Sequence, residues 1–242
     1  MKKVLVISEN SGLCIFLQEI WNKSDLKSKC SFDFRYTSYN ENPQSMINIG
    51  ASEINVKDEE VVEWIVNNYE IVFSLHCKQI FPPSLVSSVA CFNFHPGFNP
   101  HNRGWYPQAF SLINGLPIGA TIHRMDEQID HGGIIGQKEV TVSPEDTSLE
   151  VYNKVIEAEK ELIKEHIINI IDENYTLHIP SEEGNYNGIK DYERLCQLDL
   201  GSVGTLENHI DLLRALTHGE FKNAFFVKNG KKYFVKIAIS ES

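Results

Sequence analysis

Residues 3–20 read KVLVISENSGLCIFLQEI, the pattern of a buried strand, a turn and a helix. The segment 3–8 is almost continuously apolar, which is typical of a parallel strand that is covered on both faces. The apolar residues that follow have helical spacing: Leu13, Phe16, Leu17 and Ile20. This pattern predicts the first half of a βαβ unit.

Further strand-like segments follow at 32–37, 53–56, 70–75, 91–94, 119–125 and 134–142. Residues 61–66 have one apolar helical face, and a long helical period continues to about residue 172 after a capping signal at Thr147 and Glu150. Alternating strands and helices predict an α/β fold: a Rossmann-like, mostly parallel sheet flanked by helices.

The sequence becomes more polar after residue 173, where a glycine-containing connector begins. A short helix is predicted at 205–216, and Asn229-Gly230 between two apolar runs predicts a β-hairpin over 224–239. We therefore expect a main domain at 1–175 and a C-terminal extension at 176–242. Bulky apolar residues lie on both faces of the predicted hairpin, so we expect it to contribute to a homodimer contact.

The amino-acid composition and the absence of common motifs exclude several classes of function. Among 242 residues, 33 are acidic and 22 are Lys or Arg, which gives a formal net charge of −11. This balance argues against a nucleic-acid partner and against an anionic membrane surface. The five cysteines form no CxxC pair, and no apolar run is long enough for a signal peptide or a membrane span, so a cytoplasmic location is expected. The usual dinucleotide and P-loop glycine patterns are absent, and no histidine spacing indicates a metal.

The segment CFNFHPGFNPHNRGWYPQAF, residues 91–110, carries the strongest chemical signal. Asn93 and His95 are two residues apart on a strand, so their side chains project from the same face. Pro96-Gly97 ends the strand there, at the edge where open α/β sheets bind ligands. The alternative is that His95 is a turn residue that satisfies the local backbone.

A carboxylate that orients His95 is expected in the loop MDEQIDHGG, residues 125–133. Asp130 precedes a His-Gly-Gly turn, in which the glycines allow the backbone to approach a ligand closely. Taken alone, an aspartate in such a loop is more often a turn former.

Three motifs together resemble the folate-dependent formyltransferase family: Asn93-Phe-His-Pro-Gly97, then Gly119-x-Thr-x-His123, then Met125-Asp-x-x-x-Asp130-x-Gly-x-Ile. The resemblance covers roughly residues 1–175. It implies the formyltransferase fold and a catalytic centre of Asn93, His95 and Asp130. One departure is His131-Gly132, where many relatives have Thr-Gly, and we expect it to affect only the loop.

The implied reaction is formyl transfer from 10-formyltetrahydrofolate to a primary amine, with no metal. The Asn93 amide would stabilise the oxyanion of the tetrahedral intermediate. His95 would accept the proton from the attacking amine, and Asp130 would hold or charge-stabilise His95.

The resemblance also suggests where the cofactor binds. The loop before the catalytic strand offers Lys78, Gln79, Ile80 and Phe81, and the 124–130 loop adds Arg124 and Asp126. The backbone of the first loop would contact the pterin, with Ile80 and Phe81 as apolar walls. The alternative is that Ile80 and Phe81 are core residues.

The segment NRGWYP, residues 102–107, resembles the nucleotide-sugar N-formyltransferases. The tail resembles members that act on dTDP-4-amino-4,6-dideoxyglucose, so a dTDP-linked amino sugar for bacterial O-antigen or another surface polysaccharide is the expected substrate. A 3-amino sugar is the nearest alternative. A methionyl-tRNA formyltransferase, a purine-pathway formyltransferase and a non-catalytic nucleotide- or folate-binding module are weaker alternatives.

Six residues are candidates for contacting that substrate: Asn10, Arg103, Trp105, Tyr106, Tyr186 and Phe221. Arg103 offers a guanidinium fork for phosphate, and Asn10 offers an amide near the first strand–helix turn. Trp105 and Tyr106 are expected to pack on the sugar, and Tyr186 and Phe221 to stack on the base. Each has a structural alternative: a surface ion pair for Arg103, a helix anchor for Trp105 and the hairpin core for Phe221.

Overall fold

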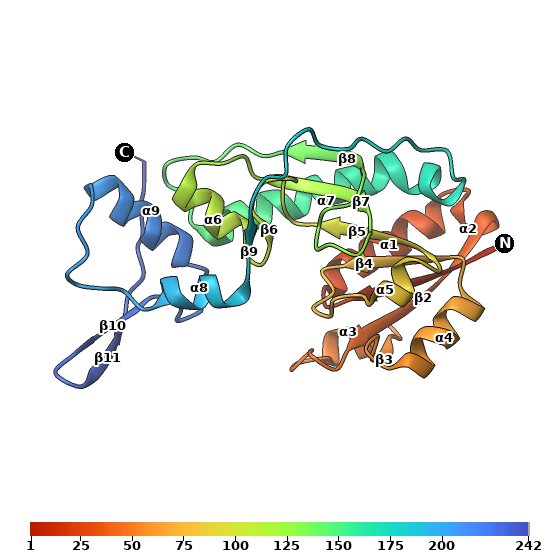
Figure 1. Ribbon diagram of the computed structural model, residues 1–242, viewed down its shortest axis with the longest axis horizontal. Helices are drawn as coiled ribbons and strands as arrows, with labels where there is room; N and C mark the ends of the chain where they lie inside the picture. The colour runs from red at the N-terminus through yellow and green to blue at the C-terminus, as the bar shows by residue number, and fades with distance from the viewer. Residues whose placement is uncertain (242) are drawn as a thin grey trace. The chain divides into compact units, whose positions relative to one another are not determined.

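The computed structural model describes residues 1–241 and divides them into two compact units (Figure 1). The first unit comprises Met1–His95, Thr121–Gln137 and Glu159–Ser181. The second comprises Pro96–Ala120, Lys138–Ala158 and the chain from Glu182 onward. The chain passes from one unit to the other several times, so neither unit is continuous in sequence.

The first unit is built on a sheet whose strand order, over the described residues, is β3-β2-β1-β4-β5-β7-β8. The strands are β1 Lys2–Ser8, β2 Cys30–Thr37, β3 Ser52–Ile54, β4 Ile71–Leu75, β5 Ala90–His95, β7 Gly119–Arg124 and β8 Ile134–Glu139. Neighbouring pairs among β1 to β5 are parallel, and β7 is antiparallel to β5. The predicted α/β class with a mostly parallel sheet is confirmed.

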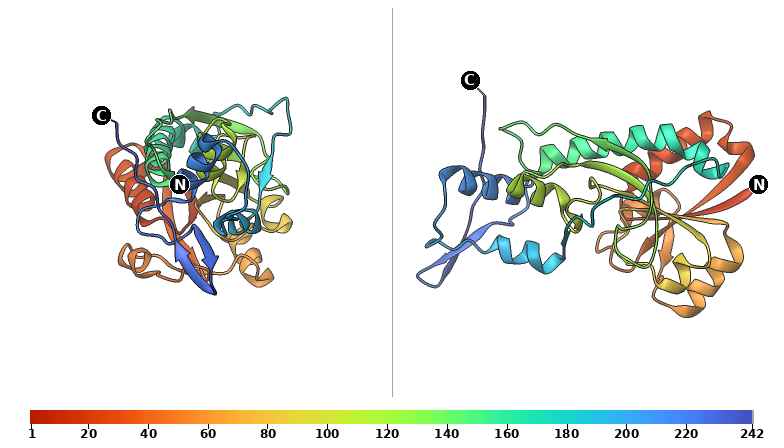
Figure 2. Two further views of the ribbon diagram at one scale, coloured as in Figure 1. Left: turned by 90° about the vertical axis from the view of Figure 1, so that its left-hand side faces the viewer. Right: turned by 45° about the horizontal axis from the view of Figure 1, so that its top comes forward.

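Helices cover both faces of this sheet: α1 Ser11–Lys23, α2 Leu26–Lys29, α3 Gln44–Asn48, α4 Glu59–Asn68, α5 Pro83–Val86 and α7 Ser148–Ile171. Helices α1 and α7 lie on one face, and α4 and α5 lie on the other (Figure 2). Leu5, Val72 and Cys91 of the central strands pack with Ile65 of α4 and Leu85 of α5 in one buried cluster. Burial on both faces explains why these strands read as continuous apolar runs.

The second unit contains β6 Arg103–Gly104, α6 Pro107–Asn114, β9 Tyr186–Asn187, α8 Ile189–Cys196, α9 Leu206–Leu216, β10 Phe225–Lys228 and β11 Lys231–Phe234. Strand β6 pairs with β9, which fastens the connector after α7 to the loop after β5. Strands β10 and β11 form the predicted hairpin around Asn229-Gly230, whose φ angles of 51° and 71° suit this two-residue turn.

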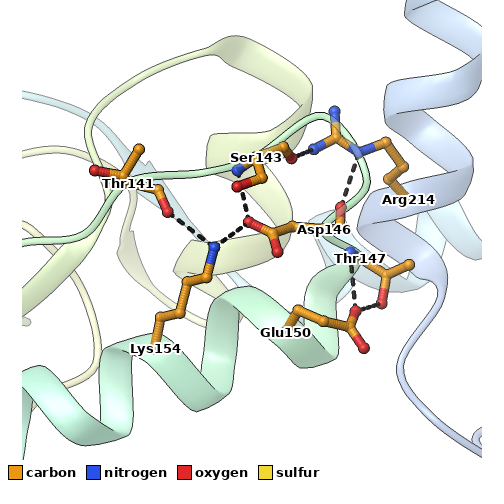
Figure 3. Close-up of polar contacts among 7 residues, drawn as sticks. All are labelled: Thr141, Ser143, Asp146, Thr147, Glu150, Lys154 and Arg214. Carbon is orange, nitrogen blue, oxygen red and sulfur yellow. Dashed lines mark hydrogen bonds and ion pairs between the residues drawn. The ribbon is translucent and has the colours of Figure 1, made fainter. Parts of the chain in front are cut away.

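A polar cluster anchors α9 to the loop before α7 (Figure 3). The Arg214 guanidinium donates to the carbonyl oxygens of Asp146 at 2.8 Å and Ser143 at 2.7 Å. The Asp146 carboxylate accepts from the Lys154 ammonium at 2.6 Å and from the Ser143 backbone at 2.6 Å. Beside them, the Glu150 carboxylate accepts from the backbone nitrogen and hydroxyl of Thr147, which is the capping interaction that the sequence predicts.

Two predicted strand ends differ from the structure. The hairpin strands end at Phe234 rather than at residue 239, and β8 ends at Glu139 rather than at 142. Helix α8 lies in a segment for which the sequence predicts no helix, and α6 follows Trp105, for which a helix anchor is only the alternative. In α6 every residue from Pro107 to Leu112 is buried, and a helix of eight residues makes too few turns for a helical period to be clear.

Within residues 1–241, no helix is both long and apolar enough to cross a membrane.

Candidate active site

Strands β5 and β7 place three polar side chains beside one another. Asn93 and His95 alternate with the buried phenylalanines of β5, and in the antiparallel register Asn93 lies opposite His123 of β7. Paired residues of an antiparallel ladder share a face, so the amide and the two imidazoles lie on the same side of the sheet. The centroids of the two imidazole rings are 6.5 Å apart.

Asp130 reaches into this group from the loop that joins β7 to β8. Its Oδ1 accepts a hydrogen bond from the Asn93 amide at 2.8 Å. Its Oδ2 lies 3.6 Å from His95 Nδ1, and its Oδ1 lies 3.5 Å from His123 Nε2. The Asp130 side chain is only 10% exposed, so these three side chains replace water as the polar surroundings of its carboxylate. The structure therefore brings Asn93, His95 and Asp130 together, as the sequence leads us to expect.

Residue 132, two positions after Asp130, must be glycine because its backbone lies against the backbone of Arg124. A Cβ atom on Gly132 would lie 1.8 Å from the carbonyl oxygen of Arg124. The backbone nitrogen of Arg124 donates to the Gly133 carbonyl at 2.8 Å, which closes the loop on β7. The sequence predicts that the two glycines allow approach to a ligand, whereas Gly132 allows approach to the end of β7. That approach fixes the loop that carries Asp130.

His95 is buried, and one of its nitrogens is left open. Only 4% of the residue is exposed. Its Nδ1 faces Asp130, while its Nε2 has no hydrogen-bond partner among the described residues. Burial lowers the pKa of His95 from 6.5 to about 4, against the opposing effect of Asp130. At neutral pH the imidazole is therefore uncharged, and its open nitrogen can receive a proton from a bound ligand.

His123 is a residue of this site to which the sequence reasoning gave no role. Its Nδ1 donates to the backbone carbonyl of Arg124 at 3.1 Å, since a carbonyl can only accept. Its Nε2 is therefore the nitrogen that faces Asp130. The Gly-x-Thr-x-His spacing was visible in the sequence, but the antiparallel pairing that sets His123 opposite Asn93 was not.

The predicted cofactor residues differ in their surroundings. Phe81 is buried in the core cluster with Val72 and Cys91, whereas Ile80 is exposed, as is Lys78. The Gln79 side chain accepts from the Val56 backbone at 3.0 Å and donates to Asn55 at 3.1 Å. These bonds hold the loop after β4 to the loop after β3. Gln79 therefore stabilises the loop, and Phe81 is part of the hydrophobic core. Their role in binding the cofactor stays a prediction.

The other two predicted cofactor residues flank the catalytic loop. The Arg124 guanidinium stacks on the Phe92 ring at 5.0 Å. The Asp126 carboxylate pairs with His131 Nδ1 at 2.8 Å, so the departure from the family pattern at His131 ties the loop to itself.

Most predicted substrate residues belong to the second unit. Arg103 is buried and donates to the Glu183 carboxylate at 2.7 Å. Tyr106 has a left-handed backbone, φ 53°, and its ring stacks on Tyr192 with centroids 4.0 Å apart. Trp105 is half-buried, and Tyr186 and Phe221 are exposed. The one candidate in the first unit, Asn10, caps α1 by accepting from the Leu13 backbone at 3.1 Å. Substrate binding by all six stays a prediction.

Comparison with known protein families shows to which family the chain belongs. A family model described as formyl transferase matches residues 32–167, which is more than half of the chain. The chain belongs to the formyltransferase family. A second model, described as the N-formyltransferase dimerization C-terminal domain, matches residues 191–241 of this formyltransferase. The resemblance that the three motifs indicated is confirmed, and the protein is a formyltransferase enzyme.

Individual relatives carry more specific names. The chain is 49% identical over 182 residues to a Mycobacterium bovis protein named dTDP-4-amino-4,6-dideoxyglucose formyltransferase, covering 75% of this chain and 77% of that protein. The structure of a sugar N-formyltransferase from Shewanella is 48% identical, with a TM-score of 0.97 over 100% of this chain and 99% of that one. A 4-N formyltransferase from Francisella tularensis is 41% identical, with a TM-score of 0.90 over the same shares.

Proposed function

We propose that this formyltransferase transfers the formyl group of 10-formyltetrahydrofolate to the 4-amino group of dTDP-4-amino-4,6-dideoxyglucose. The observation that carries the proposal is the 49% identity to a relative of that name over three quarters of both chains. Full-length similarity to a sugar N-formyltransferase and to a 4-N formyltransferase supports it. The product would serve a bacterial surface polysaccharide such as O-antigen, and we propose a cytoplasmic location for the enzyme.

The buried group around His95 fits a formyl donor and an amine. When bound, 10-formyltetrahydrofolate supplies a formyl carbon that an amine can attack. His95 Nε2 is buried and lacks a partner among residues 1–241, so it can accept the proton that the amine loses. One N–H of the Asn93 amide is directed at Asp130, and the other is the donor we assign to the developing oxyanion. Asp130 holds both groups in place and stabilises His95 once it is protonated.

We assign the pterin to the loops that carry Lys78, Ile80 and Asp126, and the nucleotide diphosphate to the guanidinium of Arg103. The ion pair of Arg103 with the Glu183 carboxylate supports this assignment, because a guanidinium fork that binds carboxylate oxygens also suits phosphate oxygens. In this proposal residues 1–175 carry the reaction, and residues 176–242 provide a homodimer contact, consistent with the dimerization model that matches there.

A 3-amino sugar remains the second candidate, but the comparisons favour the 4-amino sugar. A structure described as a sugar 3N-formyl transferase is 18% identical to this chain and shares its fold alone. The 4-N formyltransferase from Francisella tularensis is 41% identical over the whole chain.

The test is an activity screen of the purified enzyme with 10-formyltetrahydrofolate and four acceptors. The acceptors are the dTDP-linked 4-amino sugar, its 3-amino isomer, glycinamide ribonucleotide and methionyl-tRNA, and mass spectrometry detects the formylated product. We expect turnover of the 4-amino sugar and none of the tRNA. Preference for the 3-amino isomer would make that sugar the acceptor in place of the 4-amino sugar. Activity with the tRNA or the ribonucleotide alone would overturn the proposal. Ligand binding without turnover of any acceptor would indicate a non-catalytic binding module.

A further inference from the structure

Four asparagines of the second unit, which we call the asparagine cluster, join three segments that are distant in sequence. Asn102, the residue before β6, is completely buried. Its Oδ1 accepts hydrogen bonds from three side-chain amides: Asn114 at 2.8 Å, Asn185 at 2.7 Å and Asn187 at 3.1 Å. Its own amide nitrogen donates to the Ser111 hydroxyl at 2.9 Å. One side chain therefore ties the loop after β5 to α6 and to the connector after α7.

Backbone hydrogen bonds continue this connection on both sides of Arg103. The backbone nitrogen of Asn102 donates to Asn185 Oδ1 at 2.8 Å. The backbone nitrogen of Arg103 donates to the Asn185 carbonyl at 2.9 Å, and that of Trp105 donates to the Asn187 carbonyl at 2.9 Å. The backbone that carries Arg103 is therefore fixed to the connector at three successive points.

The segment held in this way has an unusual backbone. Positive φ angles occur at Asn102, 49°, at Gly104, 94°, and at Tyr106, 53°. Left-handed backbone in a residue other than glycine costs free energy, although asparagine tolerates it better than most residues. Such conformations persist only where the surrounding structure maintains them, and they are concentrated at ligand-binding and active sites.

The asparagine cluster specifies a conformation more than it adds stability. Each buried amide loses its hydrogen bonds to water, so the bonds within the cluster largely replace what folding removes. Apolar side chains of the same shape could fill this space at no greater cost. A fully bonded polar network instead makes one arrangement of its segments much better than the alternatives. The arrangement that Asn102 selects is that of the loop around Arg103.

Arg103 depends on its backbone for its direction. Its side chain is only 8% exposed, whereas that of its partner Glu183 is 68% exposed. A side chain enclosed by close-packed neighbours has few alternative rotamers, so the place of its guanidinium follows the place of its backbone. A shift at residue 102 would therefore move the guanidinium as well.

We propose that Asn102 is a positioning residue, which fixes the backbone of Arg103 so that its guanidinium meets the diphosphate of the nucleotide sugar. The proposal rests on the proposed function, because it takes Arg103 as the group that binds the diphosphate. Asn102 acts through Arg103 and need not touch the substrate. A guanidinium fork already held in its binding orientation loses less entropy on binding phosphate oxygens, which increases affinity.

The test is a double-mutant cycle of Asn102→Gly and Arg103→Gln, with dTDP binding measured by isothermal titration calorimetry. Glycine adopts the left-handed backbone readily, so Asn102→Gly removes the side chain without adding strain. We expect each single variant to bind dTDP about tenfold more weakly, the equivalent of one charge-assisted hydrogen bond. The double variant should bind no more weakly than Arg103→Gln alone, because Asn102 acts through that side chain. Affinity for 5-formyltetrahydrofolate, which we assign to the first unit, should stay unchanged in all four proteins.

A second variant and a control complete the design. Asn185→Ala removes the connector's amide from Asn102 and should give the same pattern, which keeps the test valid if Asn102→Gly does not fold. Asn223→Ala removes another side-chain amide of the second unit, which donates to the Leu216 carbonyl at 3.1 Å, and should leave dTDP affinity unchanged.

The outcomes separate the two proposals. Losses of affinity that multiply in the double variant would overturn the positioning role, because the two residues would then act independently. Folded Asn102→Gly protein that binds dTDP as tightly as the wild type would also overturn it, and so would unchanged binding in Arg103→Gln. A wild-type protein that binds no dTDP at all would overturn the proposed function itself, and the positioning role with it.

Discussion

At the level of single residues, the candidate site depends on one carboxylate that contacts three side chains. Asp130 accepts from Asn93 at 2.8 Å and lies within 3.6 Å of both His95 and His123. Its left-handed backbone, φ 51°, is a conformation that aspartate tolerates better than most residues. The distances to the two imidazoles are longer than direct hydrogen bonds, as is common at catalytic groups before substrate binds.

Removing the base or its orienting carboxylate should abolish most of the turnover. For His95→Asn and for Asp130→Asn we expect kcat to fall by ~10² or more, the scale of a positioned proton acceptor. Steady-state kinetics with the dTDP-linked 4-amino sugar measures the loss, and circular dichroism checks the fold. The same substitution at His209, in α9, serves as the control and should leave kcat unchanged. Near-normal turnover in purified His95→Asn would refute the role that we assign to it.

Burial of His95 also makes stability depend on pH. The pKa of His95 is about 4 in the folded protein and 6.5 in the unfolded reference, so the unfolded chain binds the extra proton first as the pH falls. The stability associated with the uncharged ring is complete above pH 6.5 and is lost progressively toward pH 4. Between pH 7 and pH 5 the wild type should lose on the order of 2 kcal/mol more than His95→Asn. Urea unfolding at both pH values measures the difference, and equal losses would show that His95 does not titrate as described.

At the level of secondary structure elements, the C-terminal helix α9 is attached by buried polar contacts rather than by apolar packing alone. Arg214 is 8% exposed, and its guanidinium donates to two backbone carbonyls and to the Asp211 carboxylate at 2.8 Å. The guanidinium makes these bonds from three separate nitrogens, whereas an ammonium group would have to donate from a single nitrogen. One buried side chain therefore ties α9 to the loop before α7 (Figure 3).

Arg214→Lys should loosen that attachment. Loss of at least one charge-assisted hydrogen bond in a buried setting is expected to cost about 2 kcal/mol. For a chain of this size the cost corresponds to a fall in Tm of about 4–8 °C, measured by differential scanning calorimetry. Lys236→Gln removes an ion pair with the fully exposed Glu220 and should leave Tm unchanged. A Tm equal to that of the wild type in Arg214→Lys would show that apolar contacts hold α9.

At the level of the whole molecule, the hairpin leaves apolar side chains uncovered in the single chain. Val227 is 52%, Tyr233 45% and Phe234 46% exposed. The register sets Phe225 opposite Phe234 and Phe226 opposite Tyr233, so aromatic rings lie on both faces of the ribbon. An isolated hairpin with apolar residues on two faces is typical of an interface. The dimerization model that matches residues 191–241 agrees with this interpretation.

We expect the native enzyme to sediment as a homodimer at micromolar concentration. Phe234→Lys combined with Val235→Lys should give monomers or insoluble protein, because two charges would enter the contact. Lys231→Ala, beside the exposed turn, is the matched control and should remain dimeric. Sedimentation velocity measures all three proteins. A monomeric wild type would contradict the proposal and leave the hairpin as part of its own chain's second unit.

Local sequence patterns were sufficient to predict much of the secondary structure of this protein. Apolar runs predicted the central strands, Asn229-Gly230 predicted the hairpin turn, and the strand-end positions of Asn93 and His95 predicted a site at the sheet edge. Each of these signals involves residues within a few positions of one another, where backbone geometry alone dictates the outcome. Helix α6 gave no such signal, because its eight residues make too few turns for a helical period to be clear.

Only the tertiary structure decided which distant residues meet. Asp130 reaches Asn93 across 37 positions, Arg103 pairs with Glu183 across 80, and His76 pairs with Glu159 across 83. Contacts of this range depend on sheet order, register and helix placement, which many residues determine together. For that reason the sequence by itself determined the central strands, the hairpin turn and the family to which the chain belongs. Folding decided which of these groups lie together and which partners they have.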